Sequence, residues 1–390
     1  MKRDYTLTDE QEQIRQLARD FAQSEIRPKA AEWDAKEQYH GEVIPAMGEL
    51  GFFGMLLPEE YGGLDLDMLT YLIAVEQIAW GDASVAITMS VHSSLPTQMI
   101  LKFGTDEQKQ KWLPQMASGE CIGAFALSEA DSGSDAASLK ARAVRDGDDW
   151  VLNGEKMWVT NGGTGGVTIA MVRTDEPGDR RGPRGIGAFV VPTDTPGYIV
   201  GKKEDKTGLR SSETVSVAFN DMRLPAESLL GEPDKGYIYA LSTLQGGRLG
   251  VGAQALGIAE AALQHSIDYA AERKQFGRPI KDFQGLAFKI ADMATRVEAS
   301  RGLLYRAARA WDEGDADMQL SSMTKLYCSE TAVWVTGQAV NIFGGYGFMR
   351  DYPVEKLFRD AKVTELYEGT SEIQRLVIVR TLYQDRATES

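Results

Sequence analysis

The spacing of apolar residues changes twice along this 390-residue chain, and the change limits the folds that it can adopt. Between residues 14 and 21, apolar side chains recur at the i, i+3, i+4, i+7 spacing of a helix with one face on a core. Between residues 215 and 219 they alternate with small or polar ones, which is typical of a half-buried strand. Helical spacing returns after Gly236 and continues almost to the end. The pattern predicts a β domain between two helical domains.

The fold class that follows is α+β, mainly α. We expect an N-terminal helical domain at residues 1–119, where Pro and Gly separate several helices. The middle domain, residues 120–234, is expected to be a β-barrel or a sandwich-like sheet. The C-terminal domain, residues 235–390, is expected to form a four-helix bundle, because its long helical stretches each carry an apolar face.

Four short segments give more specific predictions. Thr8 and Gln11 have the spacing of a capping box, and residues 106–117 are predicted to form the last N-terminal helix. Residues 150–160 are predicted to form strand, tight turn and strand, with Asn-Gly as the turn. The glycine-rich run at residues 162–166 lies between two strand-like stretches, which is the wrong context for a Rossmann dinucleotide site.

Charge and composition exclude several classes of function. The formal net charge is −15 with no basic block, so the electrostatic field opposes nucleic acid and anionic membranes. No apolar run approaches the roughly 20 residues of a membrane span, so membrane insertion is not expected. Two distant cysteines and three scattered histidines give no disulfide or metal pattern. The N-terminus has neither a secretion nor a transit signal, which favours the cytoplasm, or the mitochondrial matrix if a leader was removed.

Glu368 is the first candidate for chemistry, since it lies on a Gly-flanked connection beside a predicted helix N-terminus. A base that removes a proton next to a carbonyl needs a shielded, apolar setting, and the alternative is a solvated loop carboxylate. Residues 128–135 offer hydroxyls and backbone donors for a phosphate or ring edge, or else form an acidic turn. Residues 273–280 form a basic, aromatic connection that can bind an anion or complement a helix C-terminus. Residues 344–347 mark either a close backbone approach or a plain interhelical turn.

Taken in order, these segments resemble the acyl-CoA dehydrogenase family, most closely its short-chain, butyryl-type members, over nearly the whole chain. Residues 125–135 look like the family's flavin and thioester signature, and residues 154–162 look like its second flavin segment. Residues 272–284 resemble the segment that reaches FAD across a subunit interface, and residues 367–374 resemble the catalytic-base segment. The resemblance implies an FAD-dependent oxidoreductase of fatty acid β-oxidation that works as a homo-oligomer, usually a tetramer.

The resemblance also implies roles for individual residues, with Glu368 as the catalytic base and no metal ligand. Substrate contacts are implied for Ser134, Gln245, Arg248, Tyr367 and Gly369. FAD contacts are implied for Phe125, Leu127, Ser128, Gly133, Ser134, Trp158, Val159, Thr160, Arg273, Gln275, Phe276, Phe283, Gln284, Gln338, Asn341, Phe343, Gly344, Gly345, Thr370 and Glu372.

Two positions depart from the family's pattern. Gln245 stands where short-chain members usually carry Asp, on the thioester side, and Asn341 stands where Gln is usual at a cofactor contact. The isovaleryl and long-chain branches place their base near Gly247, and glutaryl-type enzymes carry an Arg near Ala86. Because this chain has neither feature, neither branch is favoured.

By resemblance, Glu368 removes the α proton of an acyl-CoA while the β hydrogen leaves as hydride to flavin N5, giving a trans-2-enoyl-CoA. Electrons then pass to an electron-transferring flavoprotein. Two alternatives remain at this point. An acyl-CoA oxidase of the same fold would pass electrons to oxygen, and a non-catalytic helical scaffold would keep the architecture as an interaction surface. Acyl chain length and branching stay open, with a short, straight chain expected.

Overall fold

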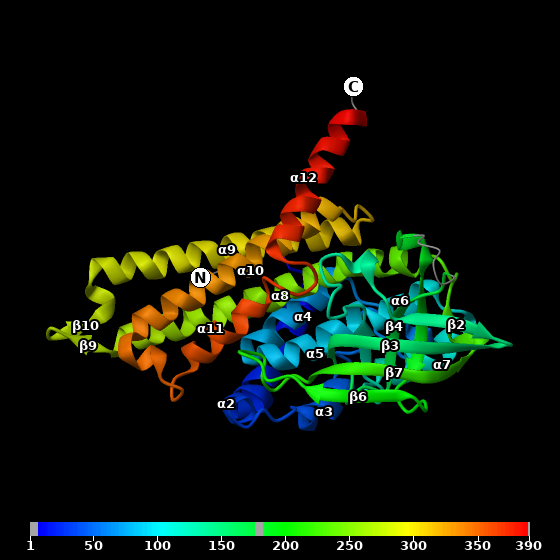
Figure 1. Cartoon of the computed structure of the whole chain (residues 1–390). Coiled ribbons are helices and arrows are strands. Elements are labelled where there is room, and N and C mark those ends of the chain that lie inside the picture. Colours follow the sequence, from blue (N-terminus) through cyan, green and yellow to red (C-terminus); the bar gives the residue numbers. More distant parts are fainter. Residues whose placement is uncertain (1–6, 176–181, 389–390) are drawn as a thin grey trace.

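The computed structural model describes residues 7–175 and 182–388, and its elements follow the order helices, sheet, helices (Figure 1). The N-terminal helices are α1 (Asp9–Phe21), α2 (Arg27–Lys36), α3 (Ile44–Glu49), α4 (Met68–Gly81), α5 (Ala83–Ser94), α6 (Pro96–Phe103) and α7 (Asp106–Ala117), with a π-helical turn at Ala22–Ile26 and 3-10 turns at Gly41–Val43 and Glu59–Tyr61. The capping box of α1 is confirmed, because Thr8 Oγ1 accepts from Gln11 N and Gln11 Oε1 accepts from Thr8 N, both at 3.1 Å. The bounds predicted for α7 are confirmed as well.

Helices α4 and α5 lie at the centre of the helical part of the molecule. Almost every residue of α4 is buried, as expected for a helix that is apolar all round. All of α5 is buried too, although it carries hydroxyl side chains such as Thr88, Ser90 and Ser93. This helix therefore brings polar groups into the interior, where each requires a hydrogen-bond partner.

The middle of the chain forms one sheet. Its strands are β1 (Gly123–Ala126), β2 (Arg142–Asp146), β3 (Asp149–Thr160), β4 (Val167–Arg173), β5 (Ile186–Pro192), β6 (Tyr198–Lys203), β7 (Thr214–Pro225) and β8 (Leu229–Leu230), with 3-10 turns at Ala136–Ser138, Gly182–Gly185 and Ala226–Ser228. The strand order is β6-β7-β3-β2-β4-β5-β8, with β1 parallel to β4. The end strands β6 and β8 do not pair with each other, so the described strands form an open, sandwich-like sheet. The barrel alternative was wrong.

The hairpin predicted at Asn153-Gly154 was also wrong. Residues 149–160 form the single strand β3, which pairs with β7 across an irregularity between Leu152 and Gly154. Gly154 has a φ of 135° and approaches Ala141 so closely that a Cβ would collide with it. The true turn precedes β3 at Gly147, whose φ is 65°. The Asn-Gly pair thus marks a bulge.

Long helices return after the sheet. They are α8 (Gly236–Glu272), α9 (Gln284–Asp312), α10 (Met318–Phe343), α11 (Pro353–Val363) and α12 (Ser371–Thr388), with the short hairpin β9 (Lys274–Gln275) and β10 (Arg278–Pro279) and 3-10 turns at Ile280–Asp282 and Gly344–Phe348. Helices α8, α9, α10 and α11 pack together, while α12 projects from the body of the molecule (Figure 1). No described helix is long and apolar enough for a membrane span.

One core joins the two helical parts, since side chains of α1, α4 and α5 pack with those of α8, α9 and α10. Figure 1 shows the sheet at one end of the long helices and the β9–β10 hairpin at the other. Two side chains expected on buried faces are exposed. Leu17 of α1 and Ile267 near the end of α8 both face solvent in the single chain.

Candidate active site

Glu368 lies on the short connection between α11 and α12, in a backbone conformation that non-glycine residues rarely adopt. Its φ is 51°, and the φ of Gly369 is 92°. Two buried side chains hold these residues in place. Lys325 Nζ donates to Gly369 O at 2.8 Å, and Gln374 Nε2 donates to Glu368 O at 3.2 Å and to Gly369 O at 3.0 Å. The backbone that carries the Glu368 side chain is therefore held from both α10 and α12.

The carboxyl group of Glu368 has the properties of a proton acceptor. Burial raises its pKa to about 7, against the opposing effects of Lys325 and Arg248. Both carboxylate oxygens are buried, and neither has a hydrogen-bond partner among the described residues. A carboxyl with a pKa near neutrality and free lone pairs can take a proton from a ligand. The solvated-loop alternative is inconsistent with this geometry.

Gly247 of α8 faces the carboxyl group and makes room for it. A Cβ at this position would collide with Glu368 Oε2 and would lie 3.1 Å from Leu95 Cδ2. The space in front of the base is therefore bounded by a bare stretch of α8 and by the end of α5. By resemblance, related branches carry their base near Gly247. This position faces Glu368.

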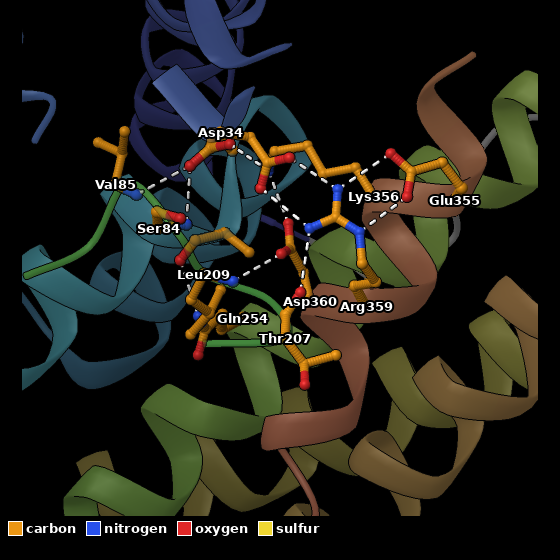
Figure 2. Close-up of polar contacts among 12 residues, drawn as sticks. Asp34, Ser84, Val85, Thr207, Leu209, Gln254, Glu355, Lys356, Arg359 and Asp360 are labelled. Atoms are coloured by element: carbon orange, nitrogen blue, oxygen red, sulfur yellow. Dashed lines mark hydrogen bonds and ion pairs between the residues drawn. The ribbon is translucent and has the colours of Figure 1, made fainter. Parts of the chain in front are cut away.

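Helix α11, which leads into the Glu368 connection, is anchored by a polar network (Figure 2). Lys356 Nζ donates to Asp82 Oδ2 and to Asp360 Oδ2, both at 2.6 Å. Leu209 N of the middle domain donates to Asp360 Oδ1 at 2.7 Å. Arg359 Nη2 donates to Asp34 Oδ2 of α2, also at 2.7 Å. All three parts of the chain thus meet behind the candidate base.

Three of the predicted substrate residues surround Glu368. Gly369 follows it, and the hydroxyl of Tyr367 donates to Gln254, whose Nε2 donates to Ala83 O at 2.8 Å. Arg248 is buried and donates from Nη1 to Ser322 Oγ at 3.2 Å, leaving Nε without a partner among the residues that the structure describes. Burial lowers the pKa of Arg248, and the Glu368 carboxyl counteracts this.

The other two predicted substrate residues lie differently. Gln245 is partly exposed and donates to Ala316 O at 2.8 Å, in the connection before α10. Its departure from the family pattern is therefore at the surface and not beside the base. Ser134 is exposed on the loop after β1.

The two predicted flavin segments of the middle domain lie together. Lys156 Nζ is buried between Glu129 Oε1 at 2.7 Å and Leu127 O at 3.1 Å, and desolvation lowers its pKa to about 8. Met157 N donates to Ser128 O at 2.9 Å. The next residue, Trp158, has a φ of 57° and is 56% exposed. An exposed indole beside the Phe125–Ser134 segment offers an aromatic face with backbone groups around it, which fits a flavin ring.

Most of the remaining predicted flavin residues lie elsewhere, at the distal end of α8. Tyr269 stacks on Phe343 at 4.0 Å, and the Arg273 guanidinium lies 5.3 Å from the centre of the Tyr346 ring. Phe276 and Phe283 meet edge to face at 5.9 Å. We call this the distal group, which comprises Arg273, Gln275, Phe276, Phe283, Gln284, Gln338, Asn341, Phe343, Gly344 and Gly345. Since about 25 residues of α8 separate Gly247 from Glu272, it lies roughly 37 Å along the helix from Glu368.

In a single chain, the distal group therefore lies far from the base. Thr370 caps α12 by accepting from Ile373 N at 3.3 Å, and Glu372 lies in its first turn, beside the base. Sequence reasoning did not find Lys325 or Gln374 as residues that hold the base. Lys325 looks like any helix lysine in the sequence, and only its complete burial on α10 distinguishes it.

Comparison with known proteins agrees with this arrangement. The chain matches the family models "Acyl-CoA dehydrogenase, N-terminal domain" over residues 8–120, "middle domain" over 124–222 and "C-terminal domain" over 234–383. It is 47% identical to an acyl-CoA dehydrogenase of Bacillus subtilis (strain 168), over 96% of this chain and 98% of the relative. It is 43% identical to a short-chain specific acyl-CoA dehydrogenase of Clostridium acetobutylicum, over 98% and 100%.

Solved structures give the same answer. Butyryl-CoA dehydrogenase from Megasphaera elsdenii matches with a TM-score of 0.95 and 43% identity, over 98% of this chain and 100% of that one. A chain in the structure described as the electron transferring flavoprotein of Acidaminococcus fermentans matches with a TM-score of 0.95 and 44% identity, over 97% and 99%. With three matching domains in order and a buried carboxyl at the expected place, the chain belongs to the acyl-CoA dehydrogenase family.

Proposed function

We propose that the protein removes hydrogen from the α and β carbons of a short-chain acyl-CoA, giving the trans-2-enoyl-CoA, with Glu368 taking the α proton. The observation that carries the proposal is the buried carboxyl of Glu368, with a pKa of about 7 and two unpartnered oxygens. Lys325 and Gln374 bind the backbone carbonyls of Glu368 and Gly369, and a base held in this way is positioned for proton transfer at carbon.

The enzyme is a flavin-dependent oxidoreductase, and FAD supplies the two-electron acceptor when it is bound. Trp158 and the Phe125–Ser134 segment would hold the flavin ring on the sheet side of Glu368. The backbone N–H of Glu368 would donate to the thioester oxygen and stabilise the negative charge that develops there. Apolar walls such as Leu95 would exclude water from the base.

A short acyl chain is supported by the relatives and by the packing around the base. The relatives from Clostridium acetobutylicum and Megasphaera elsdenii are named for short-chain and butyryl substrates. In this chain Tyr367, Gln254 and Ala83 form a hydrogen-bonded wall between α8 and α5. This wall lies next to Glu368, so it would bound the acyl chain on one side.

A homotetramer is supported by the exposed aromatic side chains of the distal group and its surroundings. Phe276 is 93% exposed and Phe348 is 85% exposed, far more than large apolar side chains usually are in a monomer. A second subunit that covered them would bring the distal group to a flavin bound near the partner's base. We also propose that electrons pass to an electron-transferring flavoprotein, supported by the neighbour from Acidaminococcus fermentans.

The test is the anaerobic visible spectrum of the holoenzyme before and after butyryl-CoA, isobutyryl-CoA and octanoyl-CoA. We expect butyryl-CoA to bleach the flavin, and Glu368→Gln to retain FAD but lose the bleaching. Glu365→Gln is the matched control, because this carboxyl lies three residues away and pairs with Lys362 on the surface. A flavin that no thioester bleaches would contradict the proposal. Peroxide formed in air with substrate would favour the oxidase.

A further inference from the structure

Three hydroxyl groups lie buried near the base without hydrogen-bond partners in the described part of the chain. They belong to Tyr71 of α4 and to Ser90 and Ser93 of α5, and their oxygens are shielded from solvent. A buried hydroxyl without a partner costs about 1–3 kcal/mol, and native proteins rarely leave three of them together. We call these residues the hydroxyl cluster.

The hydroxyl cluster faces the same bare side of α8 as Glu368. A Cβ at Gly250 would collide with Ser90 Oγ and would lie 3.9 Å from the Tyr71 hydroxyl, just as one at Gly247 would collide with the carboxyl. The two glycines are one helical step of three residues apart, which is about 4.5 Å along the axis. Glu368 therefore faces α8 at Gly247, and the hydroxyl cluster faces the same helix three residues further along, at Gly250.

Electrostatic coupling also places the hydroxyl cluster beside the base. Burial raises the pKa of Tyr71, the hydroxyls of Ser90 and Ser93 counteract this, and the Glu368 carboxyl raises it further. The Ser90 and Ser93 hydroxyls therefore lie near that of Tyr71, although none of the three makes a hydrogen bond of good geometry in the described residues. Among the charged groups, the Glu368 carboxyl is the one whose effect on the Tyr71 hydroxyl is resolved.

From this arrangement we infer that the acyl group of the substrate carries an uncharged hydrogen-bond acceptor, such as a keto oxygen, which the hydroxyl cluster binds. The inference rests on the proposed function, in which Glu368 acts at the α carbon. An extended chain advances about 1.2 Å per bond, so a step of about 4.5 Å corresponds to roughly four bonds from the α carbon to the acceptor. A carboxylate is disfavoured, because it would lie close to the Glu368 carboxyl, which carries the same charge when it acts as the base.

The test compares two thioesters of nearly the same shape on the FAD-bound enzyme. In 5-oxohexanoyl-CoA the keto oxygen lies four bonds from the α carbon, and in 5-methylhexanoyl-CoA a methyl group replaces that oxygen. We expect kcat/KM for flavin reduction to be at least about tenfold higher with the keto compound, because an unpaired polar site rejects an apolar isostere. Butyryl-CoA is the reference, since it is too short to reach the hydroxyl cluster.

Variants assign the preference to the hydroxyl cluster. Tyr71→Phe and Ser90→Ala should each reduce the ratio of kcat/KM for the keto compound to that for the methyl compound about tenfold. The reduction should come from a lower kcat/KM for the keto compound. Ser300→Ala is the matched control, because it removes a buried, unpartnered hydroxyl on α9, outside the cluster. The ratio should not change in this control.

Three outcomes would overturn the inference. A wild-type ratio near one, with butyryl-CoA still bleaching the flavin, would assign the hydroxyls to bound water and leave the proposed function intact. Preference for glutaryl-CoA over the keto compound would show that the group bound is charged. Failure of every thioester, butyryl-CoA included, would reject the proposed function together with the inference.

Discussion

At the scale of single residues, the site depends on a carboxyl that the protein keeps both buried and ionisable. Burial alone would raise the pKa of Glu368 further, and Lys325 and Arg248 limit the rise. Lys325 is completely buried and has no carboxylate within ion-pairing distance in the described residues, so its charge acts mainly on the base. Desolvation in turn lowers the pKa of Lys325 to about 8. The two groups are thus matched near neutral pH.

Replacing Lys325 by Met should move the pH profile of the reaction. Lys325 favours the ionised carboxylate, so its removal raises the pKa of Glu368 above about 7. Since the reaction needs the ionised base, the acidic limb of kcat/KM should shift to higher pH. The rate should fall most at pH 7 and recover in more alkaline buffer. Lys325→Arg keeps the charge and a donor for Gly369, so it should restore the profile. If the acidic limb of kcat/KM is not shifted in Lys325→Met, then Lys325 has only a structural role.

Gly247 supports a second prediction at this scale. In Gly247→Ala, the new methyl would collide with Glu368 Oε2 and displace the base. Turnover should fall by about 10²-fold, the order expected when a catalytic group moves by about 1 Å. FAD should stay bound, since alanine is favourable within a helix. Gly246→Ala is the control, because its methyl would meet Trp311 at 3.4 Å and Met68 at 3.8 Å, which are ordinary contact distances. Equal activities of the two variants, measured with butyryl-CoA, would contradict the assigned geometry.

At the scale of elements, sequence periodicity predicted the order of helices and sheet, because burial of one face determines both periods. The same reasoning failed at Gly154, where Asn-Gly marks a bulge whose glycine is needed to approach Ala141. Sequence reasoning found Glu368 through the local motif. It did not find Lys325, which lies far from the motif in the sequence and reaches Gly369 from α10. The resemblance supplied the distal group, and only the structure showed how far it lies from the base.

The packing of α4, α8 and α9 depends on a buried ionic network. Arg301 of α9 donates to Glu76 of α4 at 3.0 Å and pairs with Glu260 of α8, and Tyr305 donates to Glu76 at 2.9 Å. In Arg301→Met, the buried Glu76 would lose its cation, and Glu260 would keep its pair with Arg19. We expect the free energy of unfolding to fall by about 3–5 kcal/mol, measured by urea unfolding of the apoprotein.

The matched control for this network is Arg223→Met. Arg223 also pairs with carboxylates, Asp146 and Asp149, but on the exposed surface, where such pairs stabilise little. Its unfolding midpoint should stay close to that of the wild type. Equal destabilisation by both variants would show that burial of the Arg301 network carries no special weight.

At the scale of the whole molecule, one chain contains parts of two cofactor sites. The segment around Trp158 lies in the sheet at one end of the long helices, whereas the distal group lies at their other end, roughly 37 Å from Glu368 along α8. No bending of a continuous helix would bring them together. If both bind the same FAD, they come from different subunits, and cofactor retention must depend on assembly.

Phe276→Asp tests this dependence. The Phe276 side chain is almost fully exposed at the tip of the β9–β10 hairpin, so its loss should not affect the fold of one chain. A charge there should weaken both subunit association and FAD binding. Sedimentation velocity, followed at a protein and at a flavin wavelength, should therefore show smaller particles. These smaller particles should also lack FAD. Val144→Asp on β2, another exposed apolar position, should change neither. Smaller particles that retained all their FAD would mean that one chain completes the site, and the distal group would then need another role.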